Sequence, residues 1–405
     1  MQAMLSRLRR YQPTGALPRE FYTGQDDFRL ELEWIWYRDW LFVGHDCEIP
    51  NAGDYFTVKV GEYPLIVVRD RDGEIRAFHN SCRHRGSRLC AAERGRVPRF
   101  VCPYHQWTYR LDGELIAARD MGDGFEHSKY PLRAVHCART GGYIFACLAQ
   151  APPEFDAFLR QAASYLLPHR LHEAKVAFES TIVVQANWKL VWENNRECYH
   201  CAANHPELRR TYPTTPTVVS GTTVAPEVIK QWERWESAGL PSRFQLSPSG
   251  QSRLVRMPLL GDAVSFTVEG TAAVRWPLGE ATLAPNVGTV MLFHYPSTWN
   301  HVLGDHATSF RVLPLSPTET QLTTKWLVHK DAREGVDYEV SRLTQVWRAT
   351  NAEDQRLCQE NQLGVNSPSY DPAPYSPIHE AGAMQFVDWY RRHLLDRLSS
   401  TSDPV

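Results

Sequence analysis

The chain has 405 residues, 43% of them hydrophobic and 22% charged, and its 44 Lys and Arg against 46 Asp and Glu give a formal net charge of −2. This length suits two or three globular domains, and the composition excludes a disordered, collagen-like or coiled-coil chain. A dedicated nucleic-acid-binding protein carries a basic excess, so we expect no nucleic-acid partner. Because no apolar run approaches the ~20 residues of a membrane helix and no signal peptide is recognisable, we expect a cytoplasmic protein with no membrane partner.

The pattern of residues divides the chain into three segments. Residues 1–39 predict an N-terminal arm and a helix that packs on the larger, C-terminal domain. Residues 40–151 hold short β-type runs separated by Gly and Asp-Gly turns, which predict a small all-β domain. Residues 152–405 mix helical and strand patterns and form the third segment. We therefore predict an α+β protein whose larger domain has an antiparallel sheet flanked by helices.

Within the third segment, a helix is predicted at its start and another near Asn187, and residues 209–260 are expected to be irregular because they are rich in Pro and Ser. Strands are predicted between about 262 and 330, including 263–270 and 272–278. A long helix from about 336 to 360 and a final helix at 385–398 complete the prediction.

Two mixed pairs of Cys and His lie in the all-β segment: Cys82 with His84, and Cys102 with His105. Zinc also accepts two Cys and two His, but zinc fingers usually pair Cys with Cys. Pairs that each combine one Cys with one His suit a [2Fe–2S] cluster in which one iron takes both thiolates and the other both imidazoles, the Rieske arrangement. The alternative is a zinc-stabilised β domain.

The other cysteines are expected to be small buried apolar side chains, since disulfides are rare in a reducing compartment. They are Cys47, Cys90, Cys137, Cys147, Cys198, Cys201 and Cys358.

A second metal site is predicted around His200 and His205. A break in the helix before Pro206 would let both imidazoles converge, and a carboxylate would complete the facial triad of non-haem Fe(II). We choose Asp354 on the long C-terminal helix as that carboxylate, although by itself an Asp at such a position is more typical of surface charge. Its neighbours Glu353 and Glu360 are expected to be solvated. Glu197 lies three residues before His200, close enough to hydrogen-bond its far nitrogen.

With these motifs in hand, the whole chain resembles the α subunits of Rieske non-haem iron oxygenases. It is most similar to their quaternary-ammonium branch, which includes glycine betaine monooxygenase, stachydrine demethylase, choline monooxygenase and carnitine oxygenase. The resemblance is carried by ENNRECYHC at 193–201, NHPEL at 204–208 and CPYHQW at 102–107. It implies one Rieske [2Fe–2S] cluster and one Fe(II) per subunit, held by the two ligand sets named above.

The resemblance also implies a homotrimer, in which Glu197 bridges a cluster histidine of one subunit and His200 of the next. Most of the wider family has Asp at that bridge and Gly where this chain has Gln106, and both departures fit the quaternary-ammonium branch. The chain lacks a nucleotide-binding G-x-G-x-x-G fingerprint, so a separate flavin- or ferredoxin-type NAD(P)H-dependent reductase must supply electrons.

The implied reaction is oxidative N-demethylation with O₂: hydroxylation of an N-methyl group gives a hemiaminal that releases formaldehyde. Glycine betaine is the expected substrate and dimethylglycine the product; proline betaine, choline and carnitine are alternatives. Aromatic faces should hold the trimethylammonium group, and an Arg, His or amide its carboxylate. The candidates for substrate binding are Arg275, Trp276, Tyr295 and Trp299, with Phe293, His294, Asn300, His301 and Arg256 as further possibilities.

Two other classes of protein remain as competing hypotheses. A ferredoxin-like electron carrier would need only the cluster domain, and the second set of ligands and the large C-terminal segment argue against it. A structural zinc protein would be colourless, whereas a Rieske protein should be red-brown.

Overall fold

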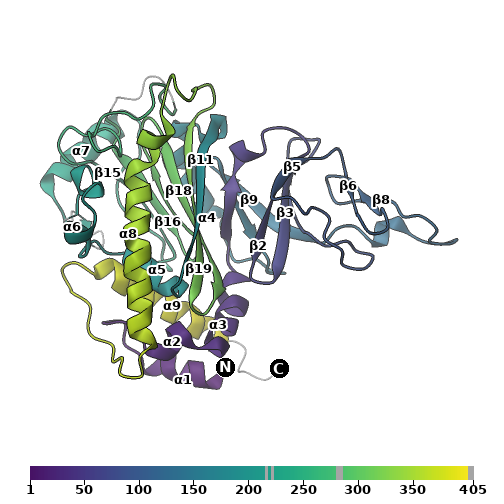
Figure 1. Cartoon of the computed structure of the whole chain (residues 1–405), viewed down its shortest axis with the longest axis horizontal. Coiled ribbons are helices and arrows are strands. Elements are labelled where there is room, and N and C mark those ends of the chain that lie inside the picture. The colour runs from purple at the N-terminus through teal and green to yellow at the C-terminus, as the bar shows by residue number, and fades with distance from the viewer. Residues whose placement is uncertain (215–217, 220–222, 280–285, 400–405) are drawn as a thin grey trace.

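The computed structural model describes residues 1–214, 218–219, 223–279 and 286–399 (Figure 1). Two seven-stranded antiparallel sheets form the framework, in the orders β1–β10–β9–β4–β3–β2–β5 and β11–β19–β18–β17–β16–β15–β14. Among the residues described, no helix is both long and apolar enough to cross a membrane.

The first sheet and a small three-stranded sheet make up the all-β part. The first sheet consists of β1 (Leu41–His45), β2 (Asp54–Val60), β3 (Tyr63–Arg69), β4 (Ile75–His79), β5 (Arg94–Arg96), β9 (Ala134–Thr140) and β10 (Tyr143–Cys147). The small sheet consists of β6 (Phe100–Val101), β7 (Thr108–Tyr109) and β8 (Leu115–Ala117). It projects at the end of the molecule farthest from α8 (Figure 1).

The second sheet belongs to the larger part and is covered by helices. Its strands are β11 (Ala174–Val184), β14 (Gln245–Leu246), β15 (Ser252–Met257), β16 (Thr289–His294), β17 (Thr298–Val302), β18 (Ala307–Ser316) and β19 (Glu319–His329), and a separate hairpin pairs β12 (Val218–Val219) with β13 (Thr223–Val224). The helices are α1 (Gln2–Arg10), α2 (Arg19–Thr23), α3 (Gln25–Glu31), α4 (Asp156–Leu166), α5 (Trp188–Asn195), α6 (Cys201–Asn204), α7 (Pro226–Ser237), α8 (Val340–Asn366) and α9 (Ala381–Ser399). The predicted α+β class, with an all-β unit beside an antiparallel sheet flanked by helices, is confirmed.

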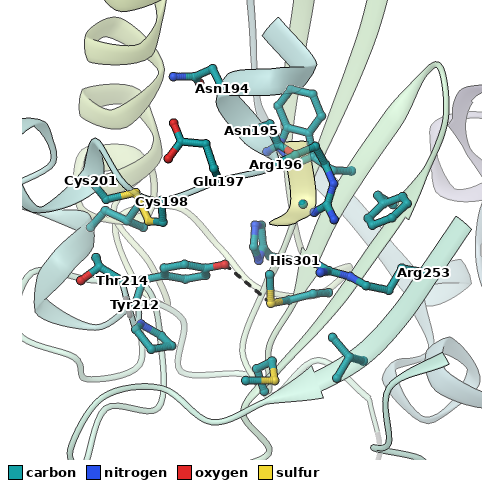
Figure 2. A pocket seen from close by; sticks show the side chains of 18 of the residues that line it. Asn194, Asn195, Arg196, Glu197, Cys198, Cys201, Tyr212, Thr214, Arg253 and His301 are labelled. Atoms are coloured by element: carbon teal, nitrogen blue, oxygen red, sulfur yellow. Dashed lines mark hydrogen bonds between the residues drawn. A yellow bond between two sulfur atoms is a disulfide. The ribbon is translucent and has the colours of Figure 1, made fainter. Parts of the chain in front are cut away.

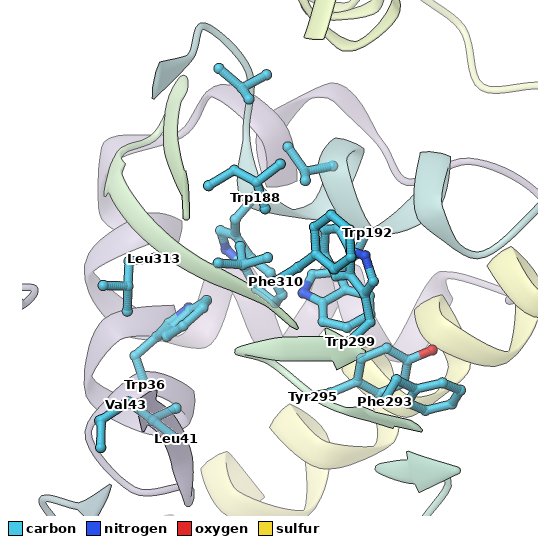
Figure 3. Close-up of a cluster of buried hydrophobic side chains, with 14 of the residues drawn as sticks. Trp36, Leu41, Val43, Trp188, Trp192, Phe293, Tyr295, Trp299, Phe310 and Leu313 are labelled. Carbon is cyan, nitrogen blue, oxygen red and sulfur yellow. The ribbon is translucent and has the colours of Figure 1, made fainter. Parts of the chain in front are cut away.

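Helix α5 is held in place by its tryptophans and by a buried ion pair. Trp188 and Trp192 lie one turn apart and pack among the aromatic side chains of the core, which include Trp36 and Trp299 (Figure 3). The ammonium of Lys189 lies 2.6 Å from Glu31, and both side chains are buried. The end of α5 therefore has a fixed position, and the segment with two of the predicted iron ligands begins there.

The two sheets are joined by polar contacts between β1 and the second sheet. The Phe42 amide donates to Ser297 Oγ at 2.8 Å, and His45 Nε2 lies 2.7 Å from Ser309 Oγ. Beyond β1, Lys325 on β19 donates to Glu48 Oε2 at 2.5 Å. These contacts fix the orientation of the two parts of the chain.

Three local predictions were wrong. Residues 263–270 and 272–278 are turns, because the buried Asp305 carboxylate accepts from Ser265 Oγ at 2.9 Å and from the Ala273 amide at 2.7 Å in place of a neighbouring strand. Residues 209–260 contain α7, β14 and β15 as well as loops. The start of the predicted arm is α1, which buries Met4, Leu5 and Leu8.

Candidate functional site

His200 and His205 are placed by a sharp change of direction after α5. Asn187 caps the start of that helix by accepting from the Lys189 amide at 2.9 Å, and the helix ends at Asn195. His200 then precedes the single turn of α6, and His205 follows it. Because Pro206 disfavours helical backbone at the residue before it, His205 leaves the helical conformation, with φ −119° and ψ 73°. The break predicted before Pro206 therefore occurs at His205.

The two imidazoles meet the carboxylate of Asp354, which reaches them from α8. The Nε2 atoms of His200 and His205 are 3.1 Å apart. Asp354 Oδ1 lies 3.3 Å from Nε2 of His200 and 3.1 Å from Nε2 of His205. The structure thus brings together all three residues predicted to hold the mononuclear iron.

The far side of each imidazole contacts another carboxylate. His200 Nδ1 lies 2.5 Å from Glu197 Oε1, and His205 Nδ1 lies 2.7 Å from Glu353 Oε2. The expectation that Glu353 is a solvated helix residue is thereby corrected, because its partly buried carboxylate contacts His205. Protons held at Nδ1 leave both Nε2 atoms as acceptors directed toward Asp354 Oδ1, and the Asn194 amide also lies 3.4 Å from His200 Nε2.

The two Nε2 atoms and Asp354 Oδ1 together suit the binding of a divalent cation. Three ligand atoms converge, because the two Nε2 atoms are the neighbours of the buried Asp354 Oδ1 at 3.3 and 3.1 Å. Although burial lowers the pKa of His200, hydrogen bonds and charge from Asp354 and Glu197 outweigh it and raise that pKa to about 9. The surroundings therefore favour positive charge. Two imidazoles and one carboxylate are the ligands that non-haem Fe(II) takes in a facial triad.

Cys198 and Cys201 flank His200 and are joined in a disulfide, which corrects the expectation of two separate thiols. Cys201 also offers a sulfur close to His200 and His205. Because that sulfur is bonded to Cys198, it is not a thiolate, and Asp354 is the third ligand that the geometry supports.

The four cluster residues lie in two loops of the same construction. The Gly86 amide donates to the Cys82 carbonyl at 2.9 Å, and the Gln106 amide donates to the Cys102 carbonyl at 3.0 Å. Each loop ends with a left-handed residue, Gly86 at φ +77° and Gln106 at φ +59°. This conformation explains why Gly is usual at the position of Gln106, since a side chain there costs about 1–2 kcal/mol.

The two loops bring two thiols and two imidazoles together. Both cysteines are buried, and the rings of His84 and His105 have centroids 4.6 Å apart. His84 stacks on Trp107, and its Nδ1 is buried without a hydrogen-bond partner. Cys90 does not join them, because its thiol faces Tyr55. A buried nitrogen without a partner beside two thiols fits a metal cluster better than a purely structural role.

A cavity of about 240 Å³ is lined in part by the three triad residues. Figure 2 shows other residues of its lining. Strands β15, β16 and β17 form one wall, and α5, α6 and α8 supply the residues near the predicted iron site. Its aromatic lining consists of Tyr212, Phe244, Phe293, Trp299, His301 and Trp347. Tyr212 contacts the sulfur of Met291 within this lining (Figure 2). The site is therefore a pocket with aromatic side chains on its strand wall and polar side chains at the triad end.

The predicted substrate-binding residues divide into two groups. Trp299 lines the pocket, as do Phe293, Asn300 and His301. Tyr295 lies behind that wall, where its hydroxyl accepts from Arg196 Nε at 2.7 Å and donates to Gln385 at 2.9 Å. His294 points to the opposite face of the sheet and packs on Phe158.

The structure places the other predicted substrate-binding residues outside the pocket. Arg275 and Trp276 lie outside the pocket, because residues 272–278 form surface turns, and Trp276 is 44% exposed and stacks on His329. Arg256 is buried elsewhere, with its guanidinium donating to the carbonyls of Val287 and Pro241.

Sequence reasoning missed Arg253, Arg196 and Glu353. The signal for Arg253 was the strand alternation in β15, in which residues 253, 255 and 257 share a face and 256 points the other way. Arg256, a further possibility from the sequence, lies on the opposite face.

Comparisons with known proteins agree with this architecture. Residues 39–133 match the model of the Rieske [2Fe-2S] domain, and residues 171–396 match that of the ring hydroxylating alpha subunit (catalytic domain). The chain is 47% identical to the glycine betaine monooxygenase oxygenase subunit of Chromohalobacter salexigens, over 97% of this chain and 89% of that protein. It is 44% identical to that of Pseudomonas aeruginosa, over 100% of this chain and 95% of that protein.

Solved structures share the fold. The quaternary ammonium Rieske monooxygenase CntA in complex with L-carnitine has a TM-score of 0.71 at 21% identity, covering 94% of this chain and 97% of that one. Naphthalene 1,2-dioxygenase from Rhodococcus sp. has a TM-score of 0.71 at 20% identity, covering 100% and 98%. The chain therefore belongs to the family of ring-hydroxylating oxygenase α subunits, with a Rieske [2Fe–2S] domain preceding the catalytic domain.

Proposed function

We propose that this chain is the oxygenase subunit of a Rieske monooxygenase that converts glycine betaine to dimethylglycine and formaldehyde. The observation that carries this proposal is the 44–47% identity, over nearly the whole chain, to glycine betaine monooxygenase oxygenase subunits. The sequence identity to a carnitine monooxygenase oxygenase subunit is 34%, and that match covers only 48% of this chain. Glycine betaine is therefore preferred over carnitine.

The two ligand sets have separate roles in this proposal. Cys82, His84, Cys102 and His105 would hold the [2Fe–2S] cluster, and His200, His205 and Asp354 would hold Fe(II). When bound, these groups supply electron storage and O₂ activation, which protein side chains alone cannot supply. The domain limits 1–39, 40–151 and 152–405 belong to this proposal as well.

The chain's own residues orient the ligands and the substrate. Glu197 accepts from the Tyr199 amide through one oxygen and faces His200 Nδ1 through the other, so that its carboxylate fixes the tautomer of His200. Glu353 does the same for His205. A trimethylammonium group accepts no hydrogen bond, so the faces of Trp299, Trp347 and neighbouring rings would hold it by cation–π contact and keep water away.

A homotrimer and a separate flavin- or ferredoxin-type reductase complete the proposal. Within one chain the cluster loops lie near β6 and β7, at the opposite end of the molecule from α6 and α8 (Figure 1). A ring of subunits would bring the cluster of one to the Glu197 of the next. A cytoplasmic location stays a prediction from the sequence.

A single-turnover experiment tests the reaction without the reductase. The purified protein is reduced chemically, freed of reductant and given O₂ with glycine betaine, proline betaine, carnitine or choline in parallel. We expect close to one formaldehyde per active site with glycine betaine. Choline hydroxylated on carbon would release none. Absence of formaldehyde with every substrate, with cluster and iron intact, would overturn the demethylase function.

A further inference from the structure

We propose that Arg253 binds the carboxylate of the substrate and so selects carboxylated quaternary amines and turns their methyl groups toward the triad residues. This inference rests on the proposed function, because it assumes a betaine in the pocket. It concerns a residue that neither the motifs nor the ligand sets include.

Arg253 lines the cavity as a cation without a partner. Its guanidinium donates no hydrogen bond and forms no ion pair with any residue that the structure describes, and its Nε is buried. Its contacts are the rings of Phe293, 5.0 Å away, and Phe244, 5.9 Å away. A buried cation usually has a counter-charge, since an unpaired one is costly. An anion in the cavity would supply that charge.

A second arginine adds positive charge to this part of the cavity, which favours the binding of an anion. Arg196 also lines the cavity, and its guanidinium lies 4.2 Å from the ring of Phe293, the ring that Arg253 contacts. Burial, and then the charge of Arg196, lower the pKa of Arg253 to about 9. The Nε of Arg196 is engaged by Tyr295, whereas Arg253 has no such contact. Arg253 is therefore the arginine of this pair whose guanidinium has no hydrogen-bond partner among the described residues.

The sheet register places Arg253 beside the aromatic wall. On adjacent strands, Arg253 is paired with Phe293 and Phe293 with Trp299, so these three side chains form one row across β15, β16 and β17. His301 lies in the next row on the same face, and in Figure 2 Arg253 extends toward it. Burial, and then Arg253, lower the pKa of His301 to about 3, so this ring is neutral. The wall thus runs from a guanidinium to uncharged rings.

The cavity offers a partner for each end of a betaine. Arg253 lies on the strand wall, and Trp299 and Trp347 also line the cavity. A carboxylate binds guanidinium through charge-assisted hydrogen bonds, which are the strong ones in proteins. A betaine whose carboxylate meets Arg253 would place its trimethylammonium group against these rings. Choline, which has the same ammonium group and a neutral hydroxyl, would leave Arg253 unpaired.

The test compares Arg253→Gln and Arg253→Lys with Arg243→Gln, an exposed arginine outside the cavity that pairs with Glu236. Binding of glycine betaine and of choline to each protein is measured by isothermal titration calorimetry, and the cluster absorbance and thermal melt report on folding. We expect Arg253→Gln to weaken glycine betaine binding by about 30-fold, since charged hydrogen bonds contribute about 1.5–3 kcal/mol. Choline binding should change less than about threefold, and Arg243→Gln should change neither.

Equal weakening for both ligands, or none for glycine betaine, would overturn the assignment. If Arg253→Gln does not fold, 3,3-dimethylbutyrate decides on the wild-type protein, because it has the carboxylate but no positive charge. We expect it to compete with glycine betaine, and failure to compete would also overturn the assignment. A wild-type protein that neither binds nor demethylates glycine betaine would instead refute the proposed function.

Discussion

Glu353 and Asp354 are consecutive on α8, yet their carboxylates contact opposite nitrogens of one imidazole. Glu353 Oε2 lies 2.7 Å from Nδ1 of His205, and Asp354 Oδ1 lies 3.1 Å from Nε2. One turn of helix thus supplies both a predicted metal ligand and the group that orients another. The two acidic residues are adjacent in the sequence, but they have different roles: Asp354 is the predicted ligand, and Glu353 orients His205.

Replacing Asp354 with Ala removes the only carboxylate that faces both Nε2 atoms in the described structure. We expect iron at this site, and turnover, to be lost while the cluster spectrum is retained. Iron and sulfide content and visible absorbance measure this, with Glu360→Gln, an exposed change on the same helix, as the control. Turnover in the Asp354→Ala protein would refute the triad.

Glu353→Ala removes the acceptor at His205 Nδ1, whereas Glu353→Gln retains an acceptor oxygen. Outer partners of metal-bound His usually contribute 10–100-fold to metal affinity or activity. We therefore expect a loss in that range for Ala and a smaller one for Gln, measured as the Fe(II) dissociation constant and as kcat/KM. Equal losses in both variants would mean that charge and not hydrogen bonding is what Glu353 provides.

Local motifs relate most of the proposed metal-binding residues to one another in the sequence. Each cluster pair falls within one loop of five residues, and His200 and His205 lie on either side of one helical turn, so short spacing alone relates them. The pocket wall comes from separate strands, and a shift of one residue changes the face on which a side chain lies. That is why Arg256 was considered and Arg253 was missed.

Part of the fold could not be predicted because it depends on hydrogen bonds to buried polar groups. Residues 263–278 alternate like strands, but hydrogen bonds to the buried Asp305 fold them into turns. A sequence pattern does not reveal which carboxylate, far away in the chain, will accept hydrogen bonds from the amides of a segment. The same holds for Arg275 and Trp276, which were assigned to the substrate from a strand that does not form.

The disulfide between Cys198 and Cys201 encloses His200 and should protect both thiols from alkylation. We expect iodoacetamide to leave this pair unmodified in denatured protein without reductant and to label it after reduction. Peptide mass spectrometry checks this, and Cys47, which is free in the structure, is the internal control. Labelling of Cys198 without reductant would show that the pair is a dithiol under those conditions.

Lys325 and Glu48 join the second sheet to the segment after β1 and are 6% and 3% exposed. Burial raises the pKa of Glu48, but the charge of Lys325 outweighs it and lowers that pKa. Lys325→Met should therefore destabilise the protein by about 3–5 kcal/mol, because it strands a buried charge. The double variant Glu48→Gln/Lys325→Met should recover much of that loss. Urea unfolding measures both, and an additive double variant would contradict the coupling.

Glu193 gives the clearest dependence of stability on pH. Burial raises its pKa from the ordinary 4.5 to about 7, even though Tyr22 and Tyr375 donate to its two oxygens. A carboxyl group with a raised pKa in the folded state favours folding at low pH, and this contribution is lost as pH rises from about 4.5 through about 7.

Glutamine at position 193 would keep the shape of the side chain without its charge. Glu193→Gln should therefore gain stability relative to wild type between pH 5 and 8, by an amount on the order of 3 kcal/mol. Urea unfolding at several pH values measures the difference, and the exposed Glu360→Gln serves as the control. A constant difference between Glu193→Gln and wild type would show that Glu193 is already ionised at pH 5.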